Sequence, residues 1–218
     1  MKESIGVTDQ ITRGPLIMCF GDSLTVGYQS PTPDVPQVRE TPYGAFLQER
    51  LKASARIAVS GLCGELTGEM VMRFQRDVLE HRPDYVIILG GTNDLGWNAQ
   101  PNEIMRNLVN MYEQALTEHI HPIPVTVPSI RMDIGSGEGQ HWLDEHILRR
   151  KNLNRLIIDY CARKKLVCID LFSATADPAT CRLAEPYSND GLHLTTEGYR
   201  RLADLLYGQV FSQRRSDK

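Results

Sequence analysis

The chain has 218 residues, of which 41% are hydrophobic and 23% are charged, and its formal net charge is −3 at pH 7. These values are ordinary for a soluble globular protein. A charge balance so close to neutral argues against nucleic acid or an anionic membrane as the main partner.

The length predicts one domain, which we expect over residues 15–212, between a flexible N-terminal segment (1–14) and a polar tail (213–218). The five cysteines include no C-x-x-C pair, which argues against a disulfide framework and a zinc knuckle. Reduced thiols, and a first fifteen residues without a signal-peptide-like apolar run, predict a cytoplasmic location. No stretch approaches the ~20 apolar residues that a membrane-spanning helix needs.

Short apolar runs alternate with longer amphipathic segments along the chain. The apolar runs, rich in β-branched residues, predict strands, and the segments with helical spacing predict helices. In chain order we expect a strand at 16–20, a helix at 43–52, a strand at 57–59, a helix at 68–81, a strand at 85–89, a helix at 101–118, a strand at 123–127, a helix at 143–163, a strand at 166–171 and a helix at 195–211.

Strand and helix thus alternate about five times. This alternation predicts an α/β fold with a parallel sheet and helices on both of its faces. Sheets of this kind bind ligands beyond the carboxyl ends of their strands. Motifs that directly follow a predicted strand are therefore the candidates for function.

Three predicted strands end in such motifs. Residues 21–24 (Gly-Asp-Ser-Leu) follow the first strand, residues 61–67 (Gly-Leu-Cys-Gly-Glu-Leu-Thr) the second, and residues 90–94 (Gly-Gly-Thr-Asn-Asp) the third. Glycine permits a sharp turn that aims the hydroxyl of Ser23 outward, and Asn93 offers an amide donor at the same sheet edge. Each motif alone is equally compatible with an ordinary helix cap.

A fourth motif, Asp190-Gly-Leu-His193, lies late in the chain. Its spacing, with a glycine between, lets a carboxylate and an imidazole fold toward one another. Asp190 is then able to hold the ring while His193 takes a proton from a serine. By itself a D-x-x-H pattern is also what an ordinary surface histidine produces.

In this order, the four motifs resemble blocks I, II, III and V of the SGNH hydrolase superfamily, the GDSL-type esterases and lipases. The resemblance extends over residues 16–211 and is carried above all by FGDSLTVG and GGTND. It implies a three-layer α/β/α sandwich, flavodoxin-like, with about five parallel strands.

The resemblance also implies roles for single residues. Ser23 is expected to be the nucleophile, His193 the general base, and Asp190 the residue that orients the imidazole. The backbone N–H groups of Ser23 and Gly64 and the side-chain amide of Asn93 are expected to form the oxyanion hole. No metal and no organic cofactor is implied.

The second block departs from the family pattern, which often has Asn at the position of Val59 and Ser at that of Cys63. A Cys63 thiolate is a conceivable nucleophile, but it would leave the Ser23 turn without a role. A small buried thiol is the simpler interpretation. The G-x-S-x-G elbow of α/β-hydrolases is absent, because Leu24 and Thr25 follow Ser23.

Two loops, residues 28–43 and 128–146, are predicted to wall the substrate pocket. Arg39 and Arg131 in these loops are candidates for an anionic substrate group, although solvated surface charge is the default interpretation. The predicted substrate contacts are apolar: Trp97, Ile130, Met132 and Trp142. Packing of loop against core explains each of them equally well.

The prediction is therefore a cofactor-independent serine esterase that hydrolyses small-molecule carboxylic esters of short to medium acyl chains. Its rivals with the same triad are a carbohydrate O-deacetylase, an acyltransferase, a lysophospholipase and a thioesterase. A rival of another class is a flavodoxin-like binding module that holds phosphate or flavin, which leaves Asp190 and His193 unexplained. No metal site is predicted, and no oligomeric state.

Overall fold

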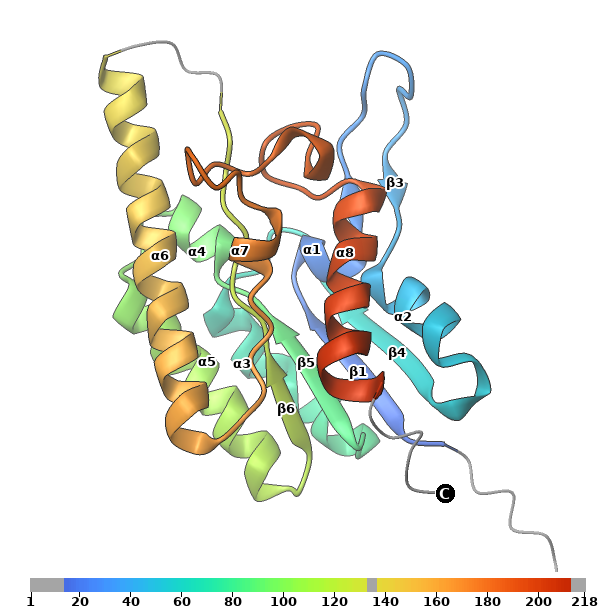
Figure 1. Ribbon diagram of the computed structural model, residues 1–218. Helices are drawn as coiled ribbons and strands as arrows, with labels where there is room; N and C mark the ends of the chain where they lie inside the picture. The colour runs from blue at the N-terminus through green and yellow to red at the C-terminus, as the bar shows by residue number, and fades with distance from the viewer. Residues whose placement is uncertain (1–13, 133–136, 213–218) are drawn as a thin grey trace, which may run out of the picture.

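The computed structural model describes residues 14–132 and 137–212. Its centre is a parallel sheet with the strand order β4–β1–β5–β6 (Figure 1). These strands are β1 (Leu16–Gly21), β4 (Arg56–Gly61), β5 (Tyr85–Leu89) and β6 (His121–Pro124). An antiparallel pair, β2 (Tyr28–Gln29) and β3 (Arg39–Glu40), lies at the base of a loop that projects beyond the sheet (Figure 1).

Helices cover both faces of the sheet. Helices α2 (Tyr43–Leu51) and α8 (Thr196–Leu206) pack on one face, and α3 (Thr67–Asp77), α5 (Pro101–Thr117) and α6 (Glu138–Lys164) on the other (Figure 1). The shorter turns are α1 (Ser23–Val26), α4 (Thr92–Gly96), α7 (Leu171–Thr175), η1 (Lys52–Ser54), η2 (Leu79–His81), η3 (Glu185–Tyr187) and the π-helical η4 (Tyr207–Phe211).

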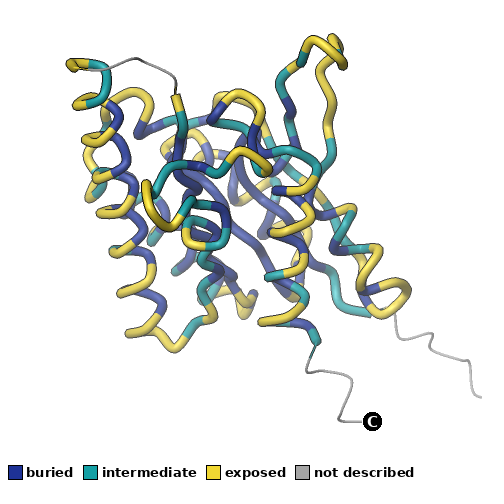
Figure 2. The backbone as a smooth tube through the Cα atoms, turned by 45° about the horizontal axis from the view of Figure 1, so that its top comes forward, coloured by how far each residue is buried: buried dark blue, intermediate teal, exposed yellow. Residues whose placement is uncertain are grey.

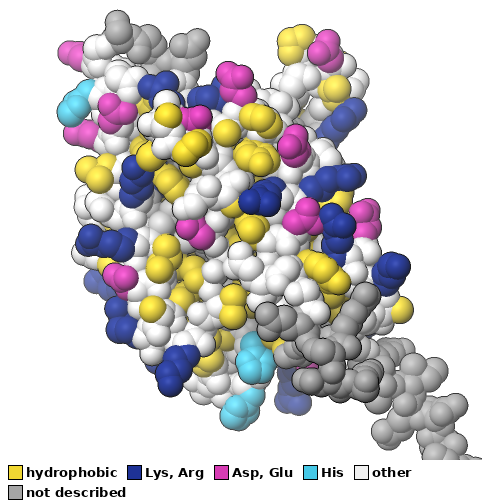
Figure 3. Space-filling view, in the orientation of Figure 1, with side chains coloured by type: hydrophobic (Ala, Val, Ile, Leu, Met, Phe, Trp, Pro, Cys, Tyr) yellow, Lys and Arg dark blue, Asp and Glu magenta, His cyan; other side chains and the backbone are white. Residues whose placement is uncertain are grey.

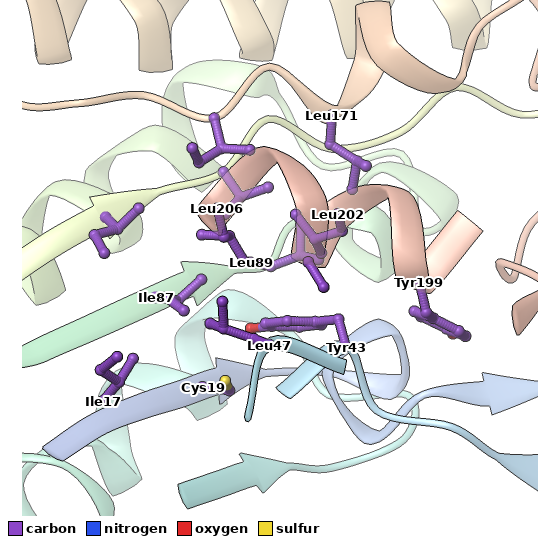
Figure 4. Close-up of a cluster of buried hydrophobic side chains, with 14 of the residues drawn as sticks. Ile17, Cys19, Tyr43, Leu47, Ile87, Leu89, Leu171, Tyr199, Leu202 and Leu206 are labelled. Atoms are coloured by element: carbon purple, nitrogen blue, oxygen red, sulfur yellow. The ribbon is translucent and has the colours of Figure 1, made fainter. Parts of the chain in front are cut away.

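Strand β5 shows why the sheet is covered on both sides, because every one of its residues is buried. Successive side chains of a strand point to opposite faces. Ile87 and Leu89 accordingly pack with α2 and α8 (Figure 4), whereas Val86 and Ile88 pack with α3, α5 and α6. In Figure 2 the buried sheet lies inside a shell of helices with exposed outer faces. The predicted three-layer α/β/α sandwich is confirmed.

The predicted fifth strand, residues 166–171, is reduced to a single bridge. Ile169 pairs in parallel with Val125 and bonds to the backbone on either side of it, at 2.9 and 3.0 Å. The N–H of Leu166 is used by the last turn of α6, and the Asp170 side chain caps α7. The residues on both sides of Ile169 thus bond to the ends of helices and not to a neighbouring strand. The sheet of the described residues therefore has four strands.

Helix boundaries differ modestly from the prediction. Helix α6 begins at Glu138, before the predicted residue 143, and α8 ends at Leu206, where the chain continues as a π-helical turn. Lys and Arg are interspersed with Asp and Glu over the face seen in Figure 3. Within the described ranges, no helix is long and apolar enough to cross a membrane. The predicted terminal segments lie outside these ranges, apart from Gly14.

Candidate active site

Three neighbouring strands end at the same level of the sheet. Gly21, the last residue of β1, pairs in register with the last residues of both β4 and β5. Ser23 then opens α1, Gly64 lies in the turn after β4, and Asn93 lies in the first turn of α4. The carboxyl edge of the sheet therefore carries all three predicted motifs, as such edges do in open α/β sheets.

The turn that carries Ser23 depends on a close approach of two strands. A Cβ on Gly21 would lie 2.1 Å from the carbonyl oxygen of Leu89, so only glycine lets β1 end this close to β5. Asp22 caps the short helix, since its Oδ1 accepts the N–H of Leu24 at 2.9 Å. Ser23 is thereby held at the start of α1, where its side chain is almost fully buried.

Hydrogen-bond donors gather beside this turn. The backbone N–H groups of Ser23 and Gly64 donate to no atom of the described residues. The Nδ2 of Asn93 donates to the carbonyl oxygen of Glu65 at 3.0 Å, which holds the amide beside the Gly64 turn. Two unengaged backbone donors and one fixed amide suit the stabilisation of a developing negative charge.

The late motif forms a tightly bonded carboxylate–imidazole pair. His193 Nδ1 lies 2.7 Å from Asp190 Oδ2, and Asp190 Oδ1 accepts the N–H groups of Leu192 and His193, both at 2.8 Å. Gly191 has a φ of 79°, and a Cβ there would collide with the carbonyl oxygen of Arg131. The chain therefore folds back so that the carboxylate fixes the orientation of the ring.

The loop of residues 28–43, predicted to wall the pocket, supports this pair. The ring of Tyr28 lies 4.5 Å from that of His193, centroid to centroid. The hydroxyl of Ser30 donates to Asp190 Oδ2. The loop thus contacts both members of the pair, the imidazole through Tyr28 and the carboxylate through Ser30.

Electrostatics differ between the two aspartates. Burial raises the pKa of Asp190, but hydrogen bonds from His193, Ser30 and two backbone N–H groups outweigh it and hold the pKa well below the ordinary value. Burial also raises the pKa of Asp22, to about 7, although the Leu24 N–H and the charge of His193 lower it. Asp190 is therefore the ionised partner of the imidazole.

The influence of His193 on Asp22 places the ring within electrostatic reach of the turn that carries Ser23. Among the hydrogen bonds of residues 14–132 and 137–212, none joins the Ser23 hydroxyl to that ring. The structure thus brings together Asp190 with His193, and Gly64 with Asn93. It does not form the serine–histidine bond.

A cavity of about 480 Å³ adjoins these groups, and both Asn93 and Asp190 line it. The four apolar residues predicted as substrate contacts all lie in its wall. Its lining consists of Thr92, Asn93, Gly96, Trp97, Ile130, Met132, Trp142, His146, Arg150, Asp190, Gly191 and Leu192. Trp97 is 80% exposed and Ile130 only 4%, so the wall ranges from an open rim to a buried floor.

Two residues weighed from the sequence have other roles here. Arg131 donates to the carbonyl oxygens of Leu183 and Ser188, so it holds the loop that carries Asp190, and it does not line the cavity beside Asn93. Cys63 is exposed, not buried as predicted. The partial desolvation that remains at its sulfur and the negative charges of Glu40 and Asp22 raise the pKa of the thiol, which disfavours a thiolate.

The sequence prediction missed Arg73, which joins the first two motifs. Its guanidinium donates to the Gly21 carbonyl oxygen at 3.0 Å, to both oxygens of Glu65 at 2.6 Å, and to Asp77 at 2.8 Å. It also stacks on the ring of Phe20, 4.2 Å from the centroid. Arg73 lies on the apolar face of α3, and an arginine in a buried stripe was the available signal.

We expect Arg73→Met to lower the free energy of unfolding by about 3–5 kcal/mol, because it leaves buried carboxylates without their cation. Urea unfolding measures the change. Arg76→Met is the matched control, because Arg76 bonds to the same Asp77 from an exposed position. Equal losses in the two variants would contradict a special role of Arg73.

The described residues contain no cluster of three or more His, Cys, Asp or Glu side chains suited to a metal ion. The ionisable groups at the sheet edge are committed instead to one another and to the backbone. What the arrangement offers chemically is an oriented imidazole, a nearby hydroxyl and several hydrogen-bond donors.

Comparisons with known proteins show the family to which the chain belongs. Residues 19–201 match the GDSL-like lipase/acylhydrolase family. The chain is 30% identical to the lipoprotein YqeF of Bacillus subtilis over 134 residues, and this match covers 58% of the chain. The match spans 52% of YqeF, about half the length of that curated relative.

Two solved structures share the fold. The lipase/acylhydrolase from Enterococcus faecalis is 26% identical with a TM-score of 0.69, over 90% of this chain and 95% of that one. The aryl esterase of M. smegmatis is 23% identical with a TM-score of 0.72, over 91% of this chain and 99% of that one. The family match favours an enzyme over the flavodoxin-like binding module. The chain therefore belongs to the GDSL-like lipase/acylhydrolase family and is an ester hydrolase.

Proposed function

We propose that this ester hydrolase cleaves carboxylic esters of short to medium acyl chains through an acyl-enzyme on Ser23. The observation that carries the proposal is the His193–Asp190 pair, 2.7 Å apart, within electrostatic reach of the turn that holds Ser23. Binding of an ester is expected to form the missing bond between the Ser23 hydroxyl and His193, since such bonds often tighten only with substrate present.

In the proposed reaction, His193 takes the proton of the Ser23 hydroxyl while the Ser23 oxygen forms a bond to the carbonyl carbon of the ester. The π electrons of the carbonyl group move onto the carbonyl oxygen, which accepts hydrogen bonds from the N–H groups of Ser23 and Gly64 and from the Asn93 amide. Collapse breaks the bond to the alcohol oxygen, which leaves with the proton from His193. Water repeats the sequence and releases the acid.

The cavity supports the substrate assignment. A volume of about 480 Å³, lined by Trp97, Ile130 and Met132 beside Asn93, suits an acyl or alcohol group of modest size. Its open rim favours access for water, which supports hydrolysis over acyl transfer to a second alcohol.

A series of p-nitrophenyl esters from acetate to laurate tests the proposal, together with labelling by a serine-reactive fluorophosphonate. We expect hydrolysis to peak at the short or medium esters, and the label to map to Ser23. Acetylated sugars, thioesters and lysophospholipids in the same panel represent the rival activities. Hydrolysis without labelling of Ser23 would contradict the serine mechanism.

We expect Asn93→Ala to lower kcat by about 10²- to 10³-fold with a smaller effect on KM, because the amide acts mainly on the charge that develops in the transition state. Steady-state kinetics on p-nitrophenyl butyrate measure both constants. The exposed Asn102 provides the control, since Asn102→Ala lies on α5 outside the cavity lining. Full kcat in Asn93→Ala would exclude the proposed role of the amide.

A further inference from the structure

Arg150 is buried in the wall of the cavity, where two of its guanidinium nitrogens have no partner among the described residues. It extends from α6, is 2% exposed, and is the largest fully buried side chain of the described residues. Its Nε and Nη1 atoms are enclosed and make no hydrogen bond. Buried polar groups in proteins are nearly always bonded, so each exception calls for an explanation.

The described residues around Arg150 supply no counter-charge. Among the ion pairs of the described residues, none includes Arg150. Asp190 lines the same cavity, but His193, Ser30 and backbone N–H groups occupy both of its oxygens. The neighbouring Arg149 bonds instead to Asn98 and to a backbone carbonyl. Arg150 thus remains an uncompensated buried cation.

The guanidinium stays charged at neutral pH. Burial, and then the charge of Arg149, lower the pKa of Arg150 to about 10. One turn earlier on α6, burial and the two arginines lower the pKa of His146, so this imidazole is neutral at pH 7. The cavity therefore carries one positive charge here. An unpaired charge in such a place lowers the stability of the fold, a loss that a bound anion offsets.

A second polar atom in the same wall lacks a partner. Thr92 lines the cavity next to Asn93, and its hydroxyl is buried without a hydrogen bond. A guanidinium and a hydroxyl are donors that suit the oxygens of a carboxylate. With one unpaired cation in the wall, and with the Asp190 carboxylate already bonded to His193 and Ser30, charge balance favours a group with one negative charge.

We infer that the substrates of this enzyme are esters that carry a single negative charge, most simply a carboxylate, which Arg150 and the Thr92 hydroxyl bind inside the cavity. The inference rests on the proposed function, because Asn93 in the same wall marks where the ester carbonyl lies. It narrows the substrate class from neutral acyl esters to those whose acyl or alcohol part is anionic.

Matched pairs of esters test this inference. Mono-p-nitrophenyl glutarate and its methyl ester place the charge on the acyl side. 4-Acetoxybenzoate and its methyl ester place it on the alcohol side. In one of the two pairs, we expect kcat/KM to be about 10- to 100-fold higher for the anion than for its methyl ester, mainly through KM. The pair that shows the preference locates the charged group.

Arg150→Met is then expected to abolish that preference, and Arg150→Lys to restore part of it, because an ammonium keeps the charge but not the planar fork. Arg155→Met, an exposed position on the same helix, is the matched control. Should Arg150→Met fail to fold, the native enzyme gives a readout of the same charge preference, through inhibition by monomethyl glutarate against dimethyl glutarate and by 4-hydroxybenzoate against its methyl ester.

The outcomes separate the two proposals. If the native enzyme hydrolyses the neutral esters with no preference for either anion, the inference on Arg150 is wrong and the serine esterase stands. If it hydrolyses none of the esters and the fluorophosphonate leaves Ser23 unlabelled, the proposed function itself fails.

Discussion

Replacing Ser23 with alanine is expected to lower kcat for ester hydrolysis by about 10⁴- to 10⁶-fold, because the only proposed covalent nucleophile is lost. The oxyanion donors and the cavity remain, so a small residual rate above that of water is expected. The Ser23 hydroxyl bonds to no described residue, so the variant should fold with nearly unchanged stability. Steady-state rates and intact-mass detection of the acyl-enzyme measure the effect.

Cys63 provides the control for this experiment. It is exposed and close in sequence to Gly64, and its thiol is the other nucleophile that the sequence offers. Because its raised pKa disfavours the thiolate, Cys63→Ser should retain the acyl-enzyme and most of the activity. If Ser23→Ala still formed an acyl-enzyme and Cys63→Ser formed none, Cys63 and not Ser23 would be the nucleophile.

The layers of the fold were predictable because the apolar runs of the strands and the helical spacing of the amphipathic segments are both clear in this chain. The uninterrupted apolar run of β5 predicts a strand covered on both faces, and the structure buries all of its residues. The fifth strand was not predictable from its composition. Residues 166–171 are apolar enough for a strand, but Asp170 caps α7 and ends the pairing after Ile169. Competition between a cap and a strand is decided by tertiary contacts.

The site, too, contains residues that the sequence predicts and residues that it does not. The motifs of Ser23 and Asn93 follow strands, so sheet topology alone brings them to one edge. The Asp190–His193 pair follows from local spacing across a glycine. Arg73 and Arg150 depend instead on which side of a helix meets the core. Both occupy apolar stripes of α3 and α6, where an arginine appears as an exception in the pattern.

The roles of the arginines near the cavity were less predictable still. Arg131 was the candidate for an anion from its loop position, yet it holds the backbone at Leu183 and Ser188. The sequence does not single out Arg150 as a binding residue, because a charged residue in a long charged helix is by default solvated. Only the packing of α6 against the cavity distinguishes the buried Arg150 from its neighbour Arg149.

Asp190→Asn is expected to lower kcat by about 10⁴-fold, through the tautomer of His193. The backbone N–H groups of Leu192 and His193 both donate to Oδ1, so the amide oxygen of asparagine takes that position. The amide NH₂ then faces His193 Nδ1 and the Ser30 hydroxyl, where Oδ2 now accepts. A donor against Nδ1 drives the ring proton to Nε2, which is then unable to accept the proton of Ser23.

Two controls separate this effect from a general loss of structure. Ser30→Ala removes one bond to Oδ2 and keeps the imidazole bond, so kcat should fall by less than about tenfold, in line with the loss of a single supporting hydrogen bond. The lowered pKa of Asp190 means that its carboxylate stabilises the fold above the ordinary carboxyl pKa of 3.8, and that this contribution is lost as the pH falls. The stability deficit of Asp190→Asn should therefore shrink from about pH 6 to about pH 3. A kcat within tenfold of the native value, in a variant that shows this stability profile, would mean that Asp190 supports the loop without setting the tautomer of the base.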